Sequence, residues 1–106
     1  INFASGSAEI PADAQDLLAK AAEALKAAPA GTKIEIGGHT DSTGDAGKNL
    51  TLSQARAEAV KAALTKLGVG AAALTAKGYG GTVPVGDNDT EAGRFKNRRI
   101  AYTIAQ

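Results

Sequence analysis

The sequence predicts an α+β fold, a two-layer α/β sandwich in which two helices cover one face of a four-stranded mixed sheet. Two observations lead to this prediction. Apolar residues repeat at helical spacing in two segments and alternate with polar residues in the segments around them, which gives the order βαβαββ. The length of 106 residues suits one compact domain, so residues 1–106 are expected to form a single unit.

The first two predicted elements are a short strand and a helix. Residues 1–3 form the extended piece. Pro11 suits the first position of a helix, because its missing N–H would have no partner there. Apolar residues then follow at helical spacing, at Leu18, Ala21, Ala22 and Leu25. Pro29 and Gly31 stop this helix, which is predicted over residues 11–28.

Three further strands are predicted over residues 33–37, 74–79 and 98–104. In the first of them, Ile34 and Ile36 alternate with polar neighbours, as in a strand that is buried on one face. The last strand alternates in the same way. A connection rich in Gly, Asn and Asp, residues 80–93, separates the last two strands.

The second helix is predicted over residues 52–67, after a loop over residues 38–49. Thr51 followed by Gln54 matches a capping box, in which each side chain bonds a free backbone N–H of the first turn. Apolar residues continue at helical spacing as far as Gly68, and glycine is the commonest residue just after a helix.

Composition and charge exclude several kinds of site. The chain has no cysteine, so it cannot form a disulfide, a thiolate metal site or a cysteine nucleophile. The formal net charge of +1 is too small to attract nucleic acid or an anionic membrane over long range. No segment approaches the roughly 18 apolar residues of a membrane span. Because the chain begins at Ile1 without a methionine or signal sequence, we expect an excised or processed domain.

Arg56 stands where the helical pattern calls for an apolar residue. Leu52 lies four residues before it and Val60 four residues after it, so Arg56 falls on or beside the core-facing stripe. We therefore expect it to be partly buried, and a buried guanidinium needs an anion. Asp41, at the end of the preceding strand, is a candidate. Three interpretations stay open: a stem that covers apolar surface, a structural salt bridge between Asp41 and Arg56, and an open site for a zwitterion.

Two other groups of polar residues suggest catalysis or metal binding, and both are weaker. His39, Asp41 and Ser42 are the residue types of a catalytic triad, but near neighbours at a strand end do not converge as nucleophile, base and orienting group. The segment that begins at Asp41 has the oxygen-rich start of a calcium loop. Its sixth position is alanine instead of glycine and its twelfth is leucine instead of glutamate, so we expect no calcium site.

Phosphate and nucleic-acid sites are also weakly supported. The glycines of residues 78–81 lack the spacing of a phosphate-binding loop. A basic cluster comprises Arg94, Lys96, Arg98 and Arg99. Only Phe95 interrupts it with an aromatic ring, and the whole chain is almost neutral, so a solvated edge is the better interpretation. We expect no nucleic-acid partner, no cofactor and no metal.

A long motif spans Thr40-Asp41, ten residues, Leu52-Ser53, two residues, Arg56-Ala57, two residues and Val60. It resembles the signature of the OmpA-like peptidoglycan-binding domain, which occurs in outer-membrane proteins, peptidoglycan-associated lipoproteins and flagellar stator proteins. Further matches are Ile1-Asn2-Phe3 with Ile10-Pro11, Gly78-Tyr79-Gly80 with Pro84, and Thr90 to Arg94 leading to Asn97-Arg98-Arg99-Ile100. The family usually has an acidic residue where this chain has Ala101, which leaves a peripheral ion pair in doubt.

The resemblance implies a binding domain without catalysis that anchors its parent protein to the cell wall. Its ligand would be the meso-diaminopimelate residue of the peptidoglycan stem peptide, whose side chain ends in an ammonium and a carboxylate. Asp41 would accept the ammonium and Arg56 would bind the carboxylate, with hydrogen bonds added by Asn49, loop amides and the N–H groups at the start of the second helix. Weaker candidates at the rim are Thr40, Asn97 and Arg98.

Two further expectations follow from this resemblance. Consecutive strand residues point to opposite faces, so at most one of Arg98 and Arg99 faces the site. The domain is expected in the periplasm, with its parent protein attached to the outer membrane or elsewhere in the cell envelope. The alternative is a protein-interaction or assembly module of the same fold, in which Asp41 and Arg56 form only a structural salt bridge.

Overall fold

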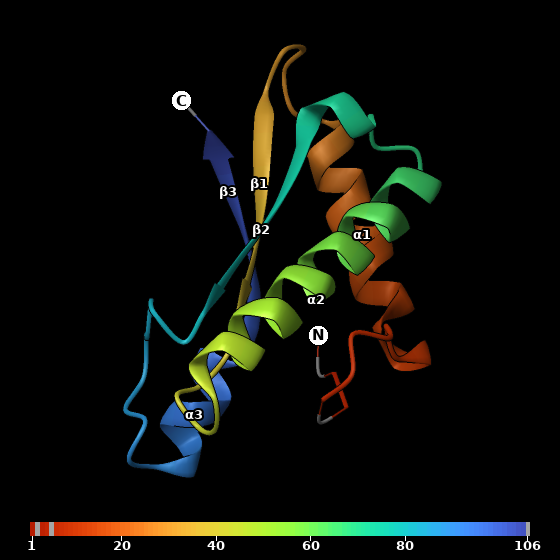
Figure 1. The fold of residues 1–106 in the computed structure, drawn as a ribbon. Coiled ribbons are helices and arrows are strands. Elements are labelled where there is room, and N and C mark those ends of the chain that lie inside the picture. Colours follow the sequence, from red (N-terminus) through yellow and green to blue (C-terminus); the bar gives the residue numbers. More distant parts are fainter. Residues whose placement is uncertain (2, 5, 106) are drawn as a thin grey trace.

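The computed structural model describes residues 1, 3–4 and 6–105 of the chain. In chain order the elements are the 3₁₀ turn η1 (Ala12–Ala14), α1 (Gln15–Lys26), β1 (Lys33–His39), α2 (Ala46–Lys66), the 3₁₀ turn η2 (Ala71–Ala73), β2 (Leu74–Gly80), α3 (Glu91–Asn97) and β3 (Arg99–Ala105). Figure 1 shows α1 and α2 on the same face of the sheet and the short α3 at one end of it. None of the helices in this part of the chain is long and apolar enough to cross a bilayer.

The sheet of the described residues has three strands in the order β2-β1-β3. β1 lies in the middle, parallel to β2 and antiparallel to β3, so the mixed sheet that was predicted is confirmed. The fourth strand predicted at residues 1–3 is not seen: Ile1 and Phe3 belong to no strand, and Asn2 lies outside the described residues. Phe3 instead packs against a guanidinium, with its ring centroid 4.9 Å from the Cζ of Arg56.

The core lies between the two long helices and the sheet. Its fully buried members come from every layer: Leu18 and Ala22 of α1, Ile34 and Ile36 of β1, Ala57, Val60 and Leu64 of α2, and Val69 and Leu74 near β2. The alternation that predicted β1 is therefore confirmed, because its two isoleucines face the helices. Burial of these side chains, at about 25 cal/mol per Å² of apolar area, fixes α2 against the strands that position the site.

Two glycines allow α2 to lie directly on the sheet. A Cβ on Gly38 would stand 2.2 Å from the carbonyl oxygen of Ser53, and one on Gly78 would stand 2.4 Å from the amide nitrogen of Gln54. No other residue fits at either position without moving the helix. The Gln54 side chain then bonds the outer edge of β2, accepting from Gly78 N at 2.7 Å and donating to the oxygen of Ala76 at 3.1 Å.

The second helix begins six residues earlier than the sequence predicted. Asp45 is its N-cap, because its side chain accepts a hydrogen bond from Lys48 N at 2.7 Å. The capping box predicted at Thr51 is therefore wrong. Thr51 lies inside α2, where its hydroxyl donates to the oxygen of Gly47 at 3.1 Å. The predicted loop over residues 38–49 thus ends at Asp45.

The helix α3 was not predicted, and it replaces the end of the connection predicted over residues 80–93. Thr90 caps it by accepting from Gly93 N at 3.0 Å. With seven residues and a glycine inside, α3 has too few apolar positions to show helical periodicity. The remaining elements agree with the predicted ones to within a few residues, apart from the start of the first helix, where η1 precedes α1.

Candidate functional site

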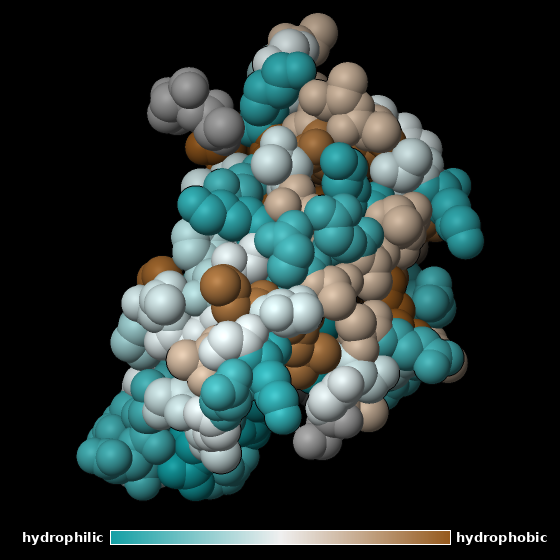
Figure 2. Space-filling view, in the orientation of Figure 1, coloured by the Kyte–Doolittle hydropathy of each residue, from teal (hydrophilic) through white to brown (hydrophobic). Residues whose placement is uncertain are grey.

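A cleft opens where β1 ends, between the first turns of α2 and the helix α3. Its volume is about 860 Å³, and it is lined by Phe3, Gly6, Thr40, Asp41, Thr43, Asp45, Lys48, Asn49, Leu52, Arg56, Glu91, Arg94 and Arg98. Figure 2 shows that hydrophilic residues gather at this end of the molecule, over α3 and the neighbouring loop. Most of the charged lining residues come from α2 and α3, so the two helices face each other with polar side chains.

Five of the six predicted site residues line this cleft: Thr40, Asp41, Asn49, Arg56 and Arg98. The sixth, Asn97, is fully buried behind it. The fold therefore brings together residues from the end of β1, from α2 and from the end of α3.

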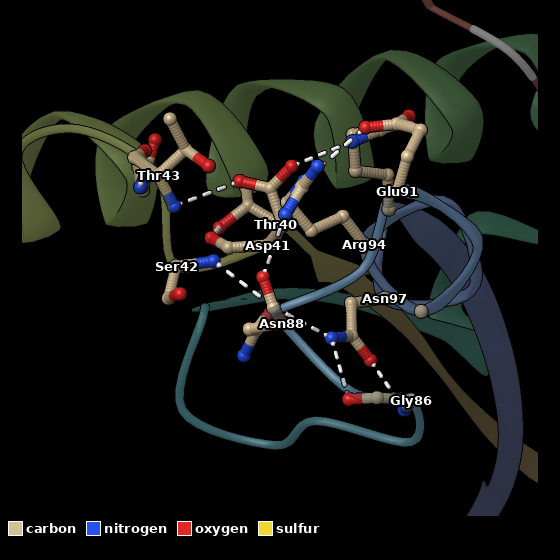
Figure 3. A network of polar contacts seen from close by, with 12 residues as sticks. Thr40, Asp41, Ser42, Thr43, Gly86, Asn88, Glu91, Arg94 and Asn97 are labelled. Carbon is tan, nitrogen blue, oxygen red and sulfur yellow. Dashed lines mark hydrogen bonds and ion pairs between the residues drawn. The ribbon is translucent and has the colours of Figure 1, made fainter.

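Asp41 is the second residue after the end of β1 and is 9% exposed. Its Oδ1 accepts from Thr43 N at 2.9 Å, and its Oδ2 accepts from Arg98 NH1 at 2.6 Å. Figure 3 shows the contact between Asp41 and Thr43 from close by. Burial pushes the pKa of Asp41 upward, but the hydrogen bonds from Arg98 and Thr43 outweigh it and hold that pKa below its ordinary value. Asp41 is therefore an anion at neutral pH.

Arg98 links Asp41 to a second carboxylate, that of Glu91. Arg98 NH2 donates to Glu91 Oε1 at 2.6 Å, and Arg94 Nε donates to Glu91 Oε2 at 3.2 Å. The four side chains form a row in which carboxylates and guanidinium groups alternate. Hydrogen bonds from Arg98 and then Arg94 lower the pKa of Glu91, and the bonds to Glu91 and then Asp41 raise that of Arg98, so the whole row is ionised.

Arg56 is partly buried, as predicted, at 9% exposed. Its partners are backbone carbonyls: Nε donates to Ser7 O at 2.8 Å and NH2 donates to Ala4 O at 3.1 Å. Its NH1 has no hydrogen-bond partner among the residues that the structure describes. Burial, and then repulsion by the Arg98 guanidinium, lower the pKa of Arg56.

The salt bridge between Asp41 and Arg56 that the sequence left open is absent from the described part of the chain. Asp41 pairs with Arg98 instead, and Arg56 is held by carbonyls. The physical reason is that carbonyl oxygens satisfy a guanidinium without desolvating a second charge. The start of α2, which the sequence placed at residue 52 close to Arg56, lies at Ala46, ten residues before Arg56 and about 15 Å along the helix.

Thr40 and Asn49 shape the wall of the cleft around Asp41. Thr40 N donates to the oxygen of Gly80 at 2.9 Å, which continues the pairing of β1 with β2 by one residue. Asn49 lies in the first turn of α2, and its Nδ2 donates to the oxygen of Thr43 at 2.9 Å. Both residues therefore hold the loop that carries the carboxylate.

Asn97 holds the loop before α3 by hydrogen bonds and does not line the cleft. Its Oδ1 accepts from Val85 N at 2.7 Å and Gly86 N at 2.8 Å, and its Nδ2 donates to Gly86 O at 3.0 Å and Asn88 Oδ1 at 2.7 Å. Asn88 Oδ1 also accepts from Ser42 N at 3.4 Å (Figure 3). Asn97 thus supports the site through its hydrogen bond to Asn88. Asn88 was not among the predicted site residues.

Arg98 faces the cleft and Arg99 does not. Arg99 donates to the oxygens of Asn97 and Val83, at 3.3 and 3.1 Å. His39, which is buried outside the cleft, stacks on Tyr79 with ring centroids 4.9 Å apart. Burial, and then the charge of Arg99, lower the pKa of His39, so its imidazole is neutral at pH 7.

Besides Asp45 and Lys48 at the start of α2, the charged cleft residues that sequence reasoning missed are Glu91 and Arg94. Both lie in the segment that carries the family resemblance, three residues apart, and that spacing places two side chains on one face of a helix. The signal was hidden because α3 itself was not predicted. In the described part of the chain, no group of three or more His, Asp or Glu side chains is placed to hold a metal ion.

The sequence pattern that defines the OmpA family matches residues 2–98, which is most of the chain. The chain belongs to the OmpA family. One relative is the outer-membrane lipoprotein YfiB of Pseudomonas aeruginosa, 44% identical over 92 residues, which are 87% of this chain and 54% of YfiB. Another is the peptidoglycan-binding protein ArfA of Mycobacterium bovis, 38% identical over 99 residues, which are 93% of this chain and 30% of ArfA.

A solved structure agrees with the fold. The peptidoglycan-associated lipoprotein of Burkholderia pseudomallei superimposes with a TM-score of 0.86 and 38% identity, covering 99% of this chain and 88% of that one. The curated relatives are longer, and the chain spans about half of YfiB and about a third of ArfA.

Proposed function

We propose that the domain binds peptidoglycan non-covalently and anchors its parent protein to the cell wall, without catalysis. The ligand group is the meso-diaminopimelate side chain of the stem peptide. One observation carries the proposal: Asp41 and Arg56, of opposite charge, line the same cleft and do not neutralise each other. A side chain that ends in both an ammonium and a carboxylate complements that pair.

The ammonium lies against Asp41. An ionised carboxylate has about four lone-pair sites, and the protein donates to each oxygen of Asp41 once, from Thr43 N and from Arg98. The remaining sites accept from the ligand. Because the low pKa of Asp41 keeps it charged, these are charge-assisted hydrogen bonds, which are about twice as strong as neutral ones.

The carboxylate lies against Arg56. Two of the guanidinium nitrogens are held by Ser7 O and Ala4 O, which fix the orientation of the group before the ligand arrives. The NH1 nitrogen donates to the ligand. Because Arg56 has no acidic partner among the described residues, its charge is free to pair with an incoming carboxylate.

The named properties of the relatives support this function and a place in the cell envelope. ArfA is a peptidoglycan-binding protein, the Burkholderia structure is of a peptidoglycan-associated lipoprotein, and YfiB is an outer-membrane lipoprotein. We infer that the domain works in the periplasm, with its parent protein attached to the outer membrane or elsewhere in the envelope.

The protonation states in the cleft favour binding over catalysis. Asp41 and Glu91 both have lowered pKa values and are bonded to arginine, so neither is suited to exchange protons near neutral pH. His39, the one histidine of the chain, does not line the cleft. The cleft therefore holds fixed charges that recognise a ligand.

Calorimetric titration with three stem peptides tests the proposal. Lysine-type peptides present the ammonium but lack the terminal carboxylate, so Arg56 would lose its partner while remaining partly desolvated. The diaminopimelate peptide is expected to bind at least about tenfold more tightly, or roughly 1.4 kcal/mol. Amidating its side-chain carboxylate should weaken binding in the same direction. Equal affinities for the three peptides would show that Arg56 does not recognise a carboxylate.

A further inference from the structure

We propose that Glu91 is a positioning residue for ligand binding: it holds Arg98 in a shared position between two carboxylates and so keeps Asp41 open to the ligand ammonium. This inference rests on the proposed function of the cleft. Arg98 gives one terminal nitrogen to each acid, NH1 to Asp41 Oδ2 and NH2 to Glu91 Oε1, both at 2.6 Å. Glu91 itself need not touch the ligand.

The geometry of a guanidinium explains why Arg98 would block Asp41 if Glu91 did not hold it. A free arginine binds a carboxylate with two parallel N–H···O bonds. If Arg98 turned both terminal nitrogens to Asp41, it would occupy the oxygens that the ligand ammonium requires. Glu91 prevents this turn, because it holds NH2 away from Asp41.

The charges in the cleft lead to the same conclusion. Asp41, Arg98, Glu91 and Arg94 alternate in sign and sum to zero. Neutralising Glu91 would leave a net charge of +1 beside the site of the ligand ammonium. The ligand ammonium would then be repelled by this excess positive charge, whereas the four side chains are now neutral in sum.

The short helix α3 fixes Glu91 from two sides. Thr90 caps α3 and places Glu91 at its first position. One turn later, Arg94 bonds the second oxygen of Glu91 at 3.2 Å, while its NH1 donates to Asn88 O at 2.9 Å. Figure 3 shows Glu91 and Arg94 beside Asp41. The Glu91 carboxylate is therefore held by Arg94 of its own helix and by Arg98 just after it.

Glu91→Gln tests the proposal, with Asp89→Asn as the matched control. Asp89 lies two residues away, carries the same charge and does not line the cleft. Binding of the diaminopimelate peptide, measured by calorimetry, should weaken about threefold to fivefold in Glu91→Gln, as for one partly exposed ion pair, and stay unchanged in Asp89→Asn. A peptide with an acetylated side-chain amine should show no difference between Glu91→Gln and the unaltered chain. An equal loss for both peptides would overturn the proposal.

A second readout separates positioning from a purely structural role. If Arg98 turns fully to Asp41 in Glu91→Gln, the pKa of Asp41, followed by carboxyl NMR, falls further. If the substitution merely loosens α3, Asp41 loses Arg98 and its pKa rises toward the ordinary value. A rise, or no change, would contradict the proposal.

The two readouts also distinguish this inference from the proposed function. Failure of the unaltered chain to bind the diaminopimelate peptide would overturn the proposed function, and the pKa measurement would still test the role of Glu91. Normal binding by the unaltered chain together with equal affinities of Glu91→Gln and Asp89→Asn would overturn the role of Glu91 alone.

Discussion

Arg98 NH1 lies 2.6 Å from Asp41 Oδ2, and this ion pair ties the junction of α3 and β3 to the end of β1. The two residues are 57 positions apart in the chain. The Asp41 side chain is 12% exposed, so the pair is shielded from solvent on one side. The anion of the cleft is therefore held in place by the folded structure and not by its own loop alone.

Asp41→Asn is expected to lower the affinity for diaminopimelate-type peptidoglycan by at least about tenfold, or roughly 1.4 kcal/mol. The amide keeps the shape of the side chain, but the ligand ammonium then faces Arg98 without the anion between them. Sedimentation with purified sacculi measures the loss, and Asp13→Asn, on the exposed turn η1, is the control. Unchanged sedimentation of Asp41→Asn would rule out Asp41 as the ammonium site.

Arg56→Lys should reduce binding by about tenfold although it keeps the charge, because one ammonium cannot hold two carbonyls and also donate to the ligand in the geometry of the planar guanidinium. Arg99→Lys is a matched control, since Arg99 also donates to two carbonyls but does not line the cleft. Peptide titration and thermal unfolding of both variants check this. Similar melting temperatures with a loss of affinity only in Arg56→Lys would identify a ligand contact, whereas full affinity would show that ligand binding does not need the guanidinium of Arg56.

The pKa of Asp41 gives a prediction about acid. It lies below the ordinary value of 3.8, so Asp41 is still mostly ionised at pH 4. Its contribution to stability is present above pH 3.8 and is lost as the pH falls through the lower folded value. Binding to sacculi should therefore persist between pH 7 and about pH 4. In Arg98→Gln the pKa of Asp41 should rise, because burial raises it and the charged hydrogen bond of Arg98 that lowered it is gone. Binding should then be lost at a higher pH than in the unaltered chain. Carboxyl NMR and sedimentation across this range check both statements.

Much of the fold could be predicted from the sequence because it depends on local patterns. Ile34 and Ile36 alternate within β1, and the helical spacing around Arg56 correctly placed that residue at the edge of the core. The helix starts were less certain. Asp45 and Thr51 are both good N-cap residues, and their positions in the chain do not show which of them the backbone uses.

The partners of the charged residues could not be predicted because they depend on packing. Arg56 is held by the carbonyls of Ala4 and Ser7, and carbonyls belong to every residue, so they leave no signal in a sequence. Arg98 reaches Asp41 only because α3 turns the chain just before it. Because α3 was not predicted, Arg98 was expected to be the first residue of a strand. Nothing in the sequence indicated which carboxylate it would pair with.

Asn97→Ala is expected to cost about 2 kcal/mol or more of folding free energy, because it leaves several hydrogen-bonding groups without partners. Asn97 is fully buried and bonds Val85 N, Gly86 N and Gly86 O. The amide of Asn49, which makes one exposed bond to a carbonyl, is the control, and Asn49→Ala should cost less than about 1 kcal/mol. Urea unfolding of the two variants compares them.

The same substitution also separates support of the site from contact with the ligand. Asn97 holds Asn88, which accepts from Ser42 N beside Asp41, so Asn97→Ala should loosen the loop that carries the carboxylate. Affinity for the diaminopimelate peptide should then fall in proportion to the lost stability and recover at lower temperature, where the loop is better ordered. A large loss of affinity at full stability would instead place Asn97 in contact with the ligand, at the rim where the sequence first suggested it.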